Sequence, residues 1–386
     1  MAQPNECNDI HNCRLLFDIV WGCLATIFFA KRPSATASLR DRAAWWLAEC
    51  NRTLSQRLKL MAVALVAPEL IVGFAAKQLI IARLFSREYD MSLTHGFFLV
   101  MGGFSDADGH PIVTRSQLSV ANVVEGIRAI DVEKIEEKSK GDLLSKTITL
   151  CQASWFIVQC IARRAQSLPL TELEVATLAF STVNALTWLL WLWKPLDVQS
   201  PIGLTVQTKP QGHVGDRPYP FGTTWLIRFG CMLTGIFVAD DYDPFSNSSV
   251  PTFWCAAESF EDHFSNQTAT AVVIQFLLGS VFGGIHCAAW ALVFPSMVEM
   301  WLWRASALVI TGLPIIFLVV GMIPERVYFI PLSASWPTAL DIFAVSMILF
   351  YSVARGILLV LPFTTLRSLP IAAFVDINWS VYIPHL

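Results

Sequence analysis

Long apolar runs bounded by charged residues divide the chain, and most of them are long enough to cross a lipid bilayer as helices. A helix needs about 20 mainly apolar residues to span the hydrocarbon core. The runs show no period-two alternation, which a membrane β-barrel would require. We therefore predict an all-α, polytopic membrane helical bundle, a single domain over residues 1–386 with about eight transmembrane helices. The expected spans are residues 14–30, 58–82, 143–163, 171–193, 225–240, 272–294, 302–323 and 338–361.

The composition supports a membrane protein and excludes several other classes. Apolar residues make up 54% of the 386 positions and charged residues only 15%, whereas about a quarter of the residues in soluble domains are charged. Glycine, proline and cysteine are close to their ordinary usage, which excludes collagen-like, disordered and disulfide-dense chains. The net charge of -3 argues against nucleic acid as a partner, because phosphate binding needs a concentrated basic face. The expected surroundings are the lipid bilayer.

Glycosylation sequons indicate how the loops are distributed between the two sides of the membrane. Two sequons, at Asn247 and Asn266, lie in the acidic segment 241–271, which contains no Lys or Arg and should be lumenal. Counting eight spans then places the loop 83–142 in the cytosol and a third sequon, at Asn51, in the lumen. Six Lys or Arg residues in the first loop oppose this topology, but we favour the sequons. The expected location is the endoplasmic reticulum membrane, as a glycoprotein.

In this topology Cys50 and Cys255 would share the oxidising lumenal compartment. Whether they form a disulfide stays open, because the sequence gives no distance between them.

Familiar catalytic and metal-binding signatures are missing from the chain. There is no dinucleotide fingerprint, no phosphate-binding loop, no zinc-protease motif and no nucleophile elbow. The nearest approach to a magnesium–diphosphate site is Asp240-Asp241-Tyr242-Asp243, which we interpret as part of a solvated loop. We therefore expect neither a metal nor another cofactor.

Ionisable groups inside the apolar runs are the candidates for function, because placing each one at membrane depth costs a few kcal/mol of free energy. Glu69 lies near the middle of the second run, just after Pro68, where a bend could open a cavity. A carboxyl group kept protonated there could serve as a general acid. A structural ion pair with Lys77, Arg163 or Arg355 is the alternative that stays open.

Other polar groups in the runs have ordinary structural interpretations beside the functional ones. Asp18 is shallower, and a helix-end contact is the more typical role. Glu172 and Glu174 open the fourth run, where two acids usually cap a helix. His286 could relay protons or bind a ligand, although a membrane histidine more often contacts a neighbouring helix. Three amides are typical of hydrogen bonds between helices: Gln152, Gln159 and Asn184.

Aromatic residues are frequent enough to line a pocket, where their ring faces could stabilise a carbocation. Most tryptophans lie at the ends of spans, which is typical of the aromatic belt at a membrane surface. Trp155 lies mid-span and does not fit that explanation. The rings considered for such a pocket are Trp21, Trp155, Phe156, Trp188, Trp191, Trp290, Trp301 and Trp303.

Several sequence strings resemble a large fungal family of multi-span membrane proteins, and the resemblance covers nearly the whole chain. The family is similar to the membrane-bound terpene cyclases of fungal meroterpenoid biosynthesis, of the ascochlorin, ascofuranone and macrophorin type. The matching strings are Asp18–Phe28, Ala67–Leu70, Thr94–Phe98, Met101–Phe104, Ser139–Asp142, Ser145-Lys146, Trp155–Arg163, Trp193–Val198, Ala354-Arg355, Leu366–Pro370 and Ile383–Leu386.

This resemblance implies a substrate with an aromatic or quinoid head and a farnesyl tail. Such a compound would be cyclised without a metal, by protonation of its terminal alkene or epoxide, and a prenyltransferase or an epoxidase could be a pathway partner. Glu69, within the Ala-Pro-Glu-Leu match, would be the proton donor, with Asp18 or His95 as alternates. The residues expected to bind the substrate are Trp155, Trp21, Trp188, Gln159, Glu172, His286 and Arg355.

The sequence departs from the family pattern at two positions. An acidic residue is expected where the chain has Leu361, and a serine where it has Gly22. The missing acid removes one candidate base and weakens the transfer of catalytic roles. The alternative function is a non-enzymatic polytopic protein, transporter or receptor-like, with an internal polar network. The absence of inverted repeats counts modestly against a transporter.

Overall fold

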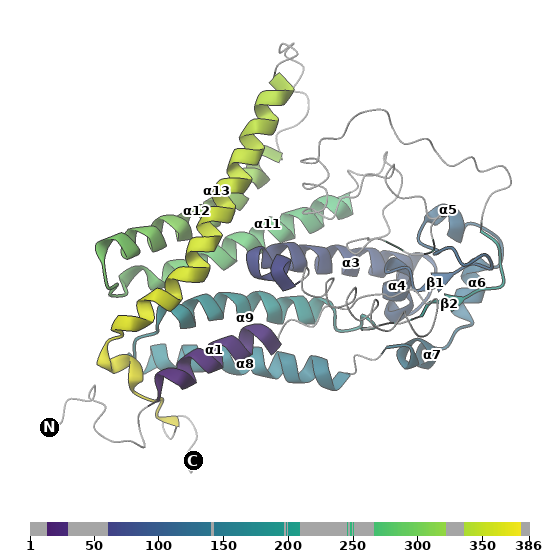
Figure 1. Ribbon diagram of the computed structural model, residues 1–386. Helices are drawn as coiled ribbons and strands as arrows, with labels where there is room; N and C mark the ends of the chain where they lie inside the picture. The colour runs from purple at the N-terminus through teal and green to yellow at the C-terminus, as the bar shows by residue number, and fades with distance from the viewer. Residues whose placement is uncertain are drawn as a thin grey trace, which may run out of the picture. The chain divides into compact units, whose positions relative to one another are not determined.

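The computed structural model describes residues 14–29, 61–139, 143–196, 198, 200–208, 245, 248, 250, 266–321 and 336–379 (Figure 1). Several predictions fall outside these residues: the span at 225–240, the sequons at Asn51 and Asn247, and the cysteines Cys50 and Cys255.

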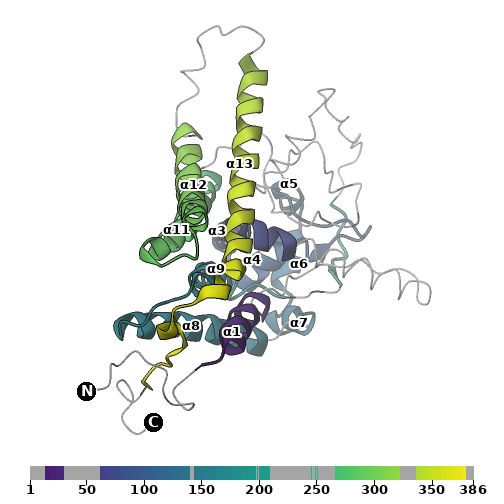
Figure 2. The same cartoon turned by 60° about the vertical axis from the view of Figure 1, so that its left-hand side comes forward.

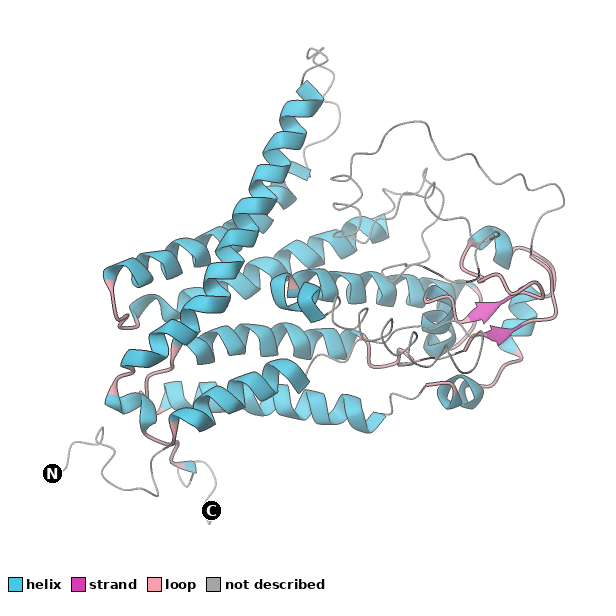
Figure 3. Ribbon diagram, in the orientation of Figure 1, coloured by secondary structure: helices cyan, strands magenta, loops and turns pink. Residues whose placement is uncertain are grey.

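Helices make up most of the described structure (Figure 3). The longer helices among these residues are α1 (Leu16–Phe29), α3 (Pro68–Glu88), α8 (Leu143–Ala165), α9 (Glu172–Leu190), α11 (Asn266–Cys287), α12 (Met297–Gly321) and α13 (Trp336–Thr365). The shorter ones are α4 (Leu93–Val100), α5 (Arg115–Leu118), α6 (Val123–Arg128) and α7 (Val132–Glu137), with the 3-10 turns η4 (Ala288–Ala291), η6 (Leu366–Ser368) and η7 (Ile371–Phe374). Two short strands, β1 (Phe104–Ser105) and β2 (Ile202–Gly203), pair in parallel, with Phe104 opposite Ile202.

Among the described residues, four stretches of helix are long and apolar enough to cross a membrane. They are Glu172–Leu190, Thr270–Ala291, Met297–Val319 and Ser346–Ser368. Each overlaps one of the predicted spans, so the mainly helical membrane architecture agrees with the sequence prediction. The count of eight is not confirmed, since the described residues contain four such stretches.

The second predicted span, residues 58–82, is interrupted at Ala67. Residues 61–66 are helical, Ala67 is not, and α3 begins at Pro68. Proline fits the first turn of a helix but disfavours helical geometry in the residue before it, which explains the break. Glu69 therefore lies in the first turn of α3 and not in the middle of a continuous helix.

The chain packs into two compact units. The first comprises Met1–Lys31, Thr147–Leu186 and Phe276–Leu386, and the second comprises Arg32–Lys146 and Thr187–Gln275. The second unit has an apolar core in which side chains of α3 and α4 pack with those of the short elements that follow, including the fully buried Phe98 and Phe104. The predicted cytosolic loop 83–142 thus contributes to this core and contains the short helices α4 to α7.

The first unit contains the residues of the candidate functional site. Helices α1, α8 and α9 share a small core formed by Cys23, Phe156, Cys160 and Leu173, and α12 packs along α13 (Figure 2). Large apolar side chains on the candidate spans are exposed at the surface of the protein, as expected of helices that face lipid tails. They include Val281, Leu308, Ile316, Leu349, Val353 and Val360.

Candidate functional site

The first turn of α9 begins with a capping box. The backbone N–H of Glu174 donates to the Thr171 hydroxyl (3.2 Å). In return, the Glu174 carboxylate accepts from the backbone N–H of Thr171 at 2.8 Å and from its hydroxyl at 3.0 Å. Two backbone groups at the helix start are thereby satisfied. The capping role expected for the acids of this turn is confirmed for Glu174.

Glu174 is also the centre of a buried ion-pair network. Both carboxylate oxygens bind the guanidinium of Arg14, and Nε of Arg163 lies 4.0 Å from Oε1 of Glu174. The Glu174 and Arg163 side chains are only 5% and 2% exposed. Buried charges of this kind persist only when they are paired and hydrogen-bonded. Arg163, one of the partners considered for Glu69, contacts Glu174 instead.

The two arginines of this network also hold the C-terminal segment. Nε of Arg14 donates to the carbonyl of Ala373 at 2.7 Å. Arg163 donates to the carbonyls of Val375 (2.7 Å) and Ala373 (3.2 Å). Arg163 also donates to the carbonyl of Pro169 at 3.0 Å, so the two arginines connect the C-terminal segment, residues 371–379, to the start of α9.

Two further contacts attach this segment to α8 and to Gln166, the residue that follows α8. The side-chain amide of Gln166 exchanges hydrogen bonds with the backbone of Asn378 (2.8 and 3.0 Å). The ring of Trp155 stacks on that of Trp379, with centroids 5.0 Å apart. Trp155, which the sequence left unexplained at mid-span, is 48% exposed and has a partner in the C-terminal segment.

Glu172 differs from Glu174, although both lie in the same helical turn. Its carboxyl group is buried, at 4% exposed, and forms a side-chain hydrogen bond with Thr365. The charged groups that act on it most strongly are two other carboxylates, Glu299 and Glu174. Within the described part of the chain, no Lys or Arg forms an ion pair with Glu172.

Glu299, in the first turn of α12, has its own cation. Arg367 lies 2.8 Å from Glu299 Oε1, and the hydroxyl groups of Ser296 (3.0 Å) and Thr364 (3.3 Å) donate to the same carboxylate. Three carboxyl groups therefore lie in this region of the first unit, and only that of Glu172 has no arginine among the described residues. Glu172 is the group that could hold a proton in place of a salt bridge.

A second polar cluster lies within the candidate spans. The ring of Phe282 on α11 receives the Arg355 guanidinium from α13, whose Cζ lies 3.9 Å from the ring centroid. The His286 ring lies 4.8 Å from the same centroid, and Phe180 of α9 meets Phe282 edge-on at 5.1 Å. Trp303 of α12 completes the cluster, 5.7 Å from His286. His286 and Arg355, both predicted as binding residues, therefore share one aromatic neighbour.

Contacts with the backbone set the orientation of His286. Its Nδ1 atom lies 2.9 Å from the carbonyl of Phe282, one helical turn earlier. The indole N–H of Trp303 donates to the backbone carbonyl of His286 at 3.1 Å. A carbonyl can only accept, so Nδ1 carries the hydrogen and Nε2 presents a lone pair in the neutral ring.

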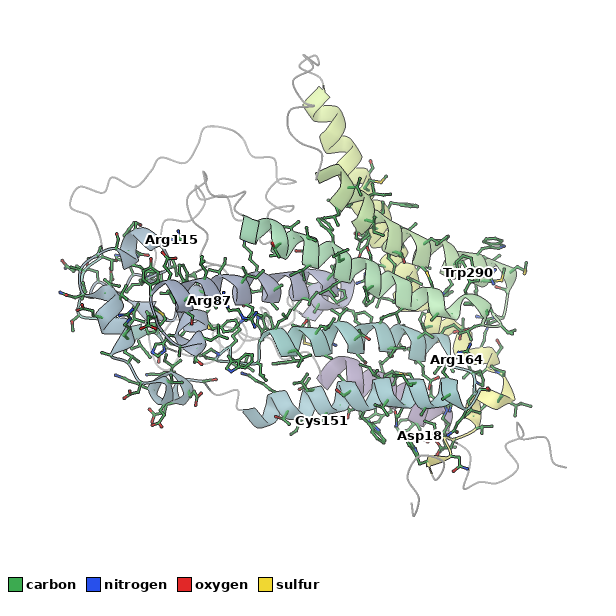
Figure 4. The ribbon with its side chains drawn as sticks, turned by 180° about the vertical axis from the view of Figure 1, so that it is seen from behind. Asp18, Arg87, Arg115, Cys151, Arg164 and Trp290 are labelled. Carbon is green, nitrogen blue, oxygen red and sulfur yellow. The ribbon has the colours of Figure 1, made fainter. Side chains whose placement is uncertain are left out.

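The three residues predicted as proton donors have different surroundings. Glu69 is 7% exposed in the first turn of α3. Asp18 is exposed at the start of α1, where it accepts from the backbone N–H of Leu15 at 3.0 Å (Figure 4). His95 is buried, with Nδ1 2.7 Å from the Ser92 hydroxyl and Nε2 2.7 Å from the carbonyl of Ile130.

The remaining predicted binding residues do not join either polar cluster. Trp21 is 59% exposed and stacks on Phe17. Trp188 is buried near the end of α9, and Gln159 is half-buried on α8. Among the described residues, no three His, Cys, Asp or Glu side chains gather as a metal site would require.

A family model matches residues 86–211 and 267–386, which together cover more than half of the chain. The protein belongs to DUF8562, a family of unknown function. Glu172, His286 and Arg355 lie inside the region that matches DUF8562, whereas Asp18 and Glu69 lie before it. Comparisons with curated proteins and with solved structures gave no match.

Sequence reasoning missed several residues of this DUF8562 member's polar clusters. Glu299 carries a readable signal, because Ser296 and Glu299 have capping-box spacing directly before an apolar run. The backbone N–H of Glu299 does donate to the Ser296 hydroxyl, at 3.2 Å. Arg14 and Thr365 carry no comparable local signal, because their partners are far away along the chain.

Proposed function

We propose that this protein is a membrane-bound, metal-independent terpene cyclase. It would cyclise a farnesylated aromatic or quinoid compound by protonating the terminal alkene or epoxide of the tail. The observation that carries the proposal is Glu172, a buried carboxyl group at the start of a candidate span. It has no ion-pair partner among the described residues, and its charged neighbours are carboxylates. In such surroundings the uncharged, protonated carboxyl is the less costly state.

A protonated acid of this kind suits the first step of the reaction. Its proton adds to the terminal carbon–carbon double bond to give a tertiary carbocation, or to the epoxide oxygen as the ring opens. An internal double bond then attacks the cationic carbon, and loss of a proton from the cyclised cation restores the acid, so the product is an isomer of the substrate. Apolar surroundings help because they exclude the water that would trap the cation.

Glu69 is the second candidate acid, and the resemblance to the cyclase family favours it. It is also buried and also lies in a first helical turn. Asp18 is less suited because it is exposed. His95 is less suited because the Ser92 hydroxyl and the Ile130 carbonyl occupy both ring nitrogens.

The proposal includes eight spans in the endoplasmic reticulum membrane. Helix α8 would be a further span in addition to the four candidates. Its residues 147–162 carry no charge, and the cations at both of its ends have partners. Lys146 donates to the carbonyls of Leu192 (2.9 Å) and Lys194 (2.7 Å), and Arg163 pairs with Glu174. An apolar face of α8 is exposed at Ile148, Trp155, Val158 and Ile161.

Glycosylation mapping tests this topology. Glycosidase treatment should remove N-linked glycans from the wild-type protein. Asn247→Gln and Asn51→Gln should each abolish one of these glycans. Glycan-free protein, or a glycan on an engineered sequon in the loop 83–142, would contradict the topology.

The cyclase proposal is tested by expression in a fungal host that makes no related compounds. Fed with a farnesylated phenol or its terminal epoxide, the cells should form a product of identical mass and different retention time. Glu172→Gln should abolish this product while the protein level is kept. Glu133→Gln, on an exposed position of α7, is the matched control and should leave product formation unchanged.

The outcome for Glu69→Gln separates the two candidate acids. If Glu69→Gln abolishes the product and Glu172→Gln does not, Glu69 is the proton donor. The cyclase proposal then holds, with Glu69 in place of Glu172 as the acid. If several such precursors pass through the wild type unchanged, the cyclase proposal fails.

A non-enzymatic polytopic protein is the second candidate function. The ion pairs of Glu174 with Arg14 and Arg163, and of Glu299 with Arg367, favour it, since they form the internal polar network such a protein would contain. Under this alternative Glu172 is one more structural member of the network. Glu172→Gln would then lower the amount of folded protein, and no precursor would be converted.

A further inference from the structure

A cation lies on the face of α12 that is otherwise exposed and apolar. Exposed residues recur on this face at helical spacing: Met297 (68%), Trp301 (60%) and Leu308 (55%). Arg304 belongs to the same series, because it follows Trp301 by three positions and precedes Leu308 by four. Its partly exposed side chain therefore shares the side of the candidate span that lipid would cover.

Arg304 also lies near the end of its span. It is seven positions after Met297, the first residue of α12, which corresponds to about 10 Å along the helix. Nη2 of Arg304 donates to the carbonyl of Trp290 at 2.7 Å, and Trp290 lies at the turn between α11 and α12 (Figure 4). The side chain is thus directed back toward the turn, as long cationic side chains near a membrane surface are.

No carboxylate neutralises this cation within the described part of the chain. The carbonyl of Trp290 is the one acceptor that the described residues offer to the five N–H groups of the guanidinium. The nearest acid along the chain, Glu299, is paired with Arg367 at 2.8 Å. A charge at the edge of the hydrocarbon core is costly unless it is paired. The partner is therefore expected from outside the protein.

Two exposed indole rings flank the guanidinium. Its Cζ atom lies 5.0 Å from the ring centroid of Trp290 and 5.9 Å from that of Trp301, distances at which a cation is attracted to an aromatic ring. Among the described residues, neither indole N–H has an acceptor. Tryptophan is enriched where hydrocarbon meets the head groups. One cation and two indole donors thus face the same layer of the membrane.

The surroundings of these donors favour a lipid over a soluble anion. Exposed apolar side chains surround the turn, with Val293 82%, Val298 68% and Leu302 40% exposed. Such side chains would contact acyl chains. In the topology proposed above, the turn between the spans 272–294 and 302–323 faces the cytosol, the side on which anionic lipids are concentrated.

We propose that Arg304, Trp290 and Trp301 form a binding site for the head-group phosphate of an anionic phospholipid. The phosphate oxygens accept from the Nη groups of Arg304 and from the indole N–H groups, and the acyl chains lie along the exposed face of α12. A head group with an ammonium would place a second cation beside the guanidinium. Phosphatidylinositol therefore fits better than phosphatidylcholine.

Lipid titration of the purified full chain in detergent tests the site, with bound lipids counted by native mass spectrometry. The wild type should bind its first phosphatidylinositol about tenfold more tightly than its first phosphatidylcholine, since a hydrogen bond to a charged group is worth at least that ratio. Arg304→Gln should bind the two lipids equally. Arg304→Lys, which keeps the charge but not the planar fork, should retain part of the preference.

The matched control is Arg164→Gln. Arg164 is an exposed cation at the end of α8, and its replacement should leave the full preference, because it removes the same charge from a position outside the site. An equal loss of preference in Arg164→Gln and Arg304→Gln would mean that net charge alone attracts the lipid, and would overturn the site.

Two further results would contradict the proposal. It fails if the wild type does not distinguish the two lipids, or if Arg304→Gln keeps the full preference. Should Arg304→Gln not fold, Trp301→Leu decides, since loss of one indole donor and one flanking ring should lower the preference at least about threefold, and an unchanged preference overturns the site.

A soluble competitor distinguishes a lipid from a free phosphate compound. Glycerophosphoinositol, which has the same head group without acyl chains, should not displace phosphatidylinositol at equal concentration. Complete displacement would show that the site takes a soluble anion. None of these measurements requires turnover, so a protein that converts no precursor can still confirm the lipid site, and a working cyclase can still lack it.

Discussion

Glu172 and Glu174 lie two residues apart in the first turn of α9, yet only Glu174 has arginine partners among the described residues. Two residues along a helix correspond to a rotation of about 200°, so the two carboxyl groups leave the helix on opposite sides. Glu174 meets Arg14 and Arg163, while Glu172 meets the hydroxyl of Thr365. The same residue type in one turn therefore has two different chemical roles.

This difference predicts unequal effects of two charge-neutralising substitutions on stability. Glu174→Gln leaves the buried Arg163 without its counter-ion and should destabilise the folded protein by about 3–5 kcal/mol, the usual cost of breaking a buried pair. Glu172→Gln removes no cation contact and should change stability by less than about 1 kcal/mol. Thermal unfolding of the two variants in the same detergent measures this. Equal losses of stability would show that Glu172 also belongs to the structural network.

A close approach of α11 to α12 makes a second prediction. A Cβ atom on Gly283 would lie 2.5 Å from the backbone nitrogen of Thr311, whereas one on Gly284 would meet nothing within 4 Å. Gly283→Ala should therefore force α11 away from α12, at a cost of about 1–3 kcal/mol, and Gly284→Ala should be close to neutral. The midpoint of thermal unfolding compares the two variants. A neutral Gly283→Ala would mean that α12 moves easily.

The sequence predicted well those features that depend on local pattern. The four candidate spans were found because apolar runs of about 20 residues are long enough to cross a bilayer. The capping role confirmed for Glu174 followed from the place of two acids in the first turn of the predicted helix. The bend expected at Pro68 is present as the break at Ala67, since proline disfavours helical geometry in the preceding residue.

Features that depend on partners distant in the chain were not predictable. Arg14 and Glu174 are 160 positions apart, and Arg163 reaches carbonyls more than 200 positions away. The parallel pairing of Phe104 with Ile202 has no local signal either, because each strand has only two residues. Glu172 and Glu174 looked equivalent in the sequence, and only their neighbours distinguish them.

His95 provides a third prediction because both of its ring nitrogens are engaged. His95→Phe would leave the buried carbonyl of Ile130 without its donor, at a cost of about 1–3 kcal/mol, whereas the exposed Ser92 hydroxyl can bind water instead. We expect a lower unfolding temperature and less folded protein. The product formed per amount of folded protein should stay at the wild-type level. A stable but inactive His95→Phe would instead support His95 as the proton donor.

The C-terminal segment makes a fourth prediction, because it supplies acceptors to the partly buried Arg14 and the buried Arg163. Deletion of residues 371–386 removes the carbonyls of Ala373 and Val375, which accept from Arg14 and Arg163. It also removes Trp379, on which the exposed ring of Trp155 stacks. Donors of a buried guanidinium that lose their acceptors cost more than neutral ones, so this deletion should lower the unfolding temperature strongly.

The matched control for this prediction is deletion of residues 380–386, which keeps every one of those contacts. We expect it to unfold close to the wild-type temperature, and the difference between the two deletions to be reduced in Arg163→Gln, where fewer donors depend on the segment. Equal unfolding temperatures for the two deletions would mean that water or lipid head groups replace the lost carbonyls. In that case Glu174 and the carbonyl of Pro169 would suffice to hold the arginines.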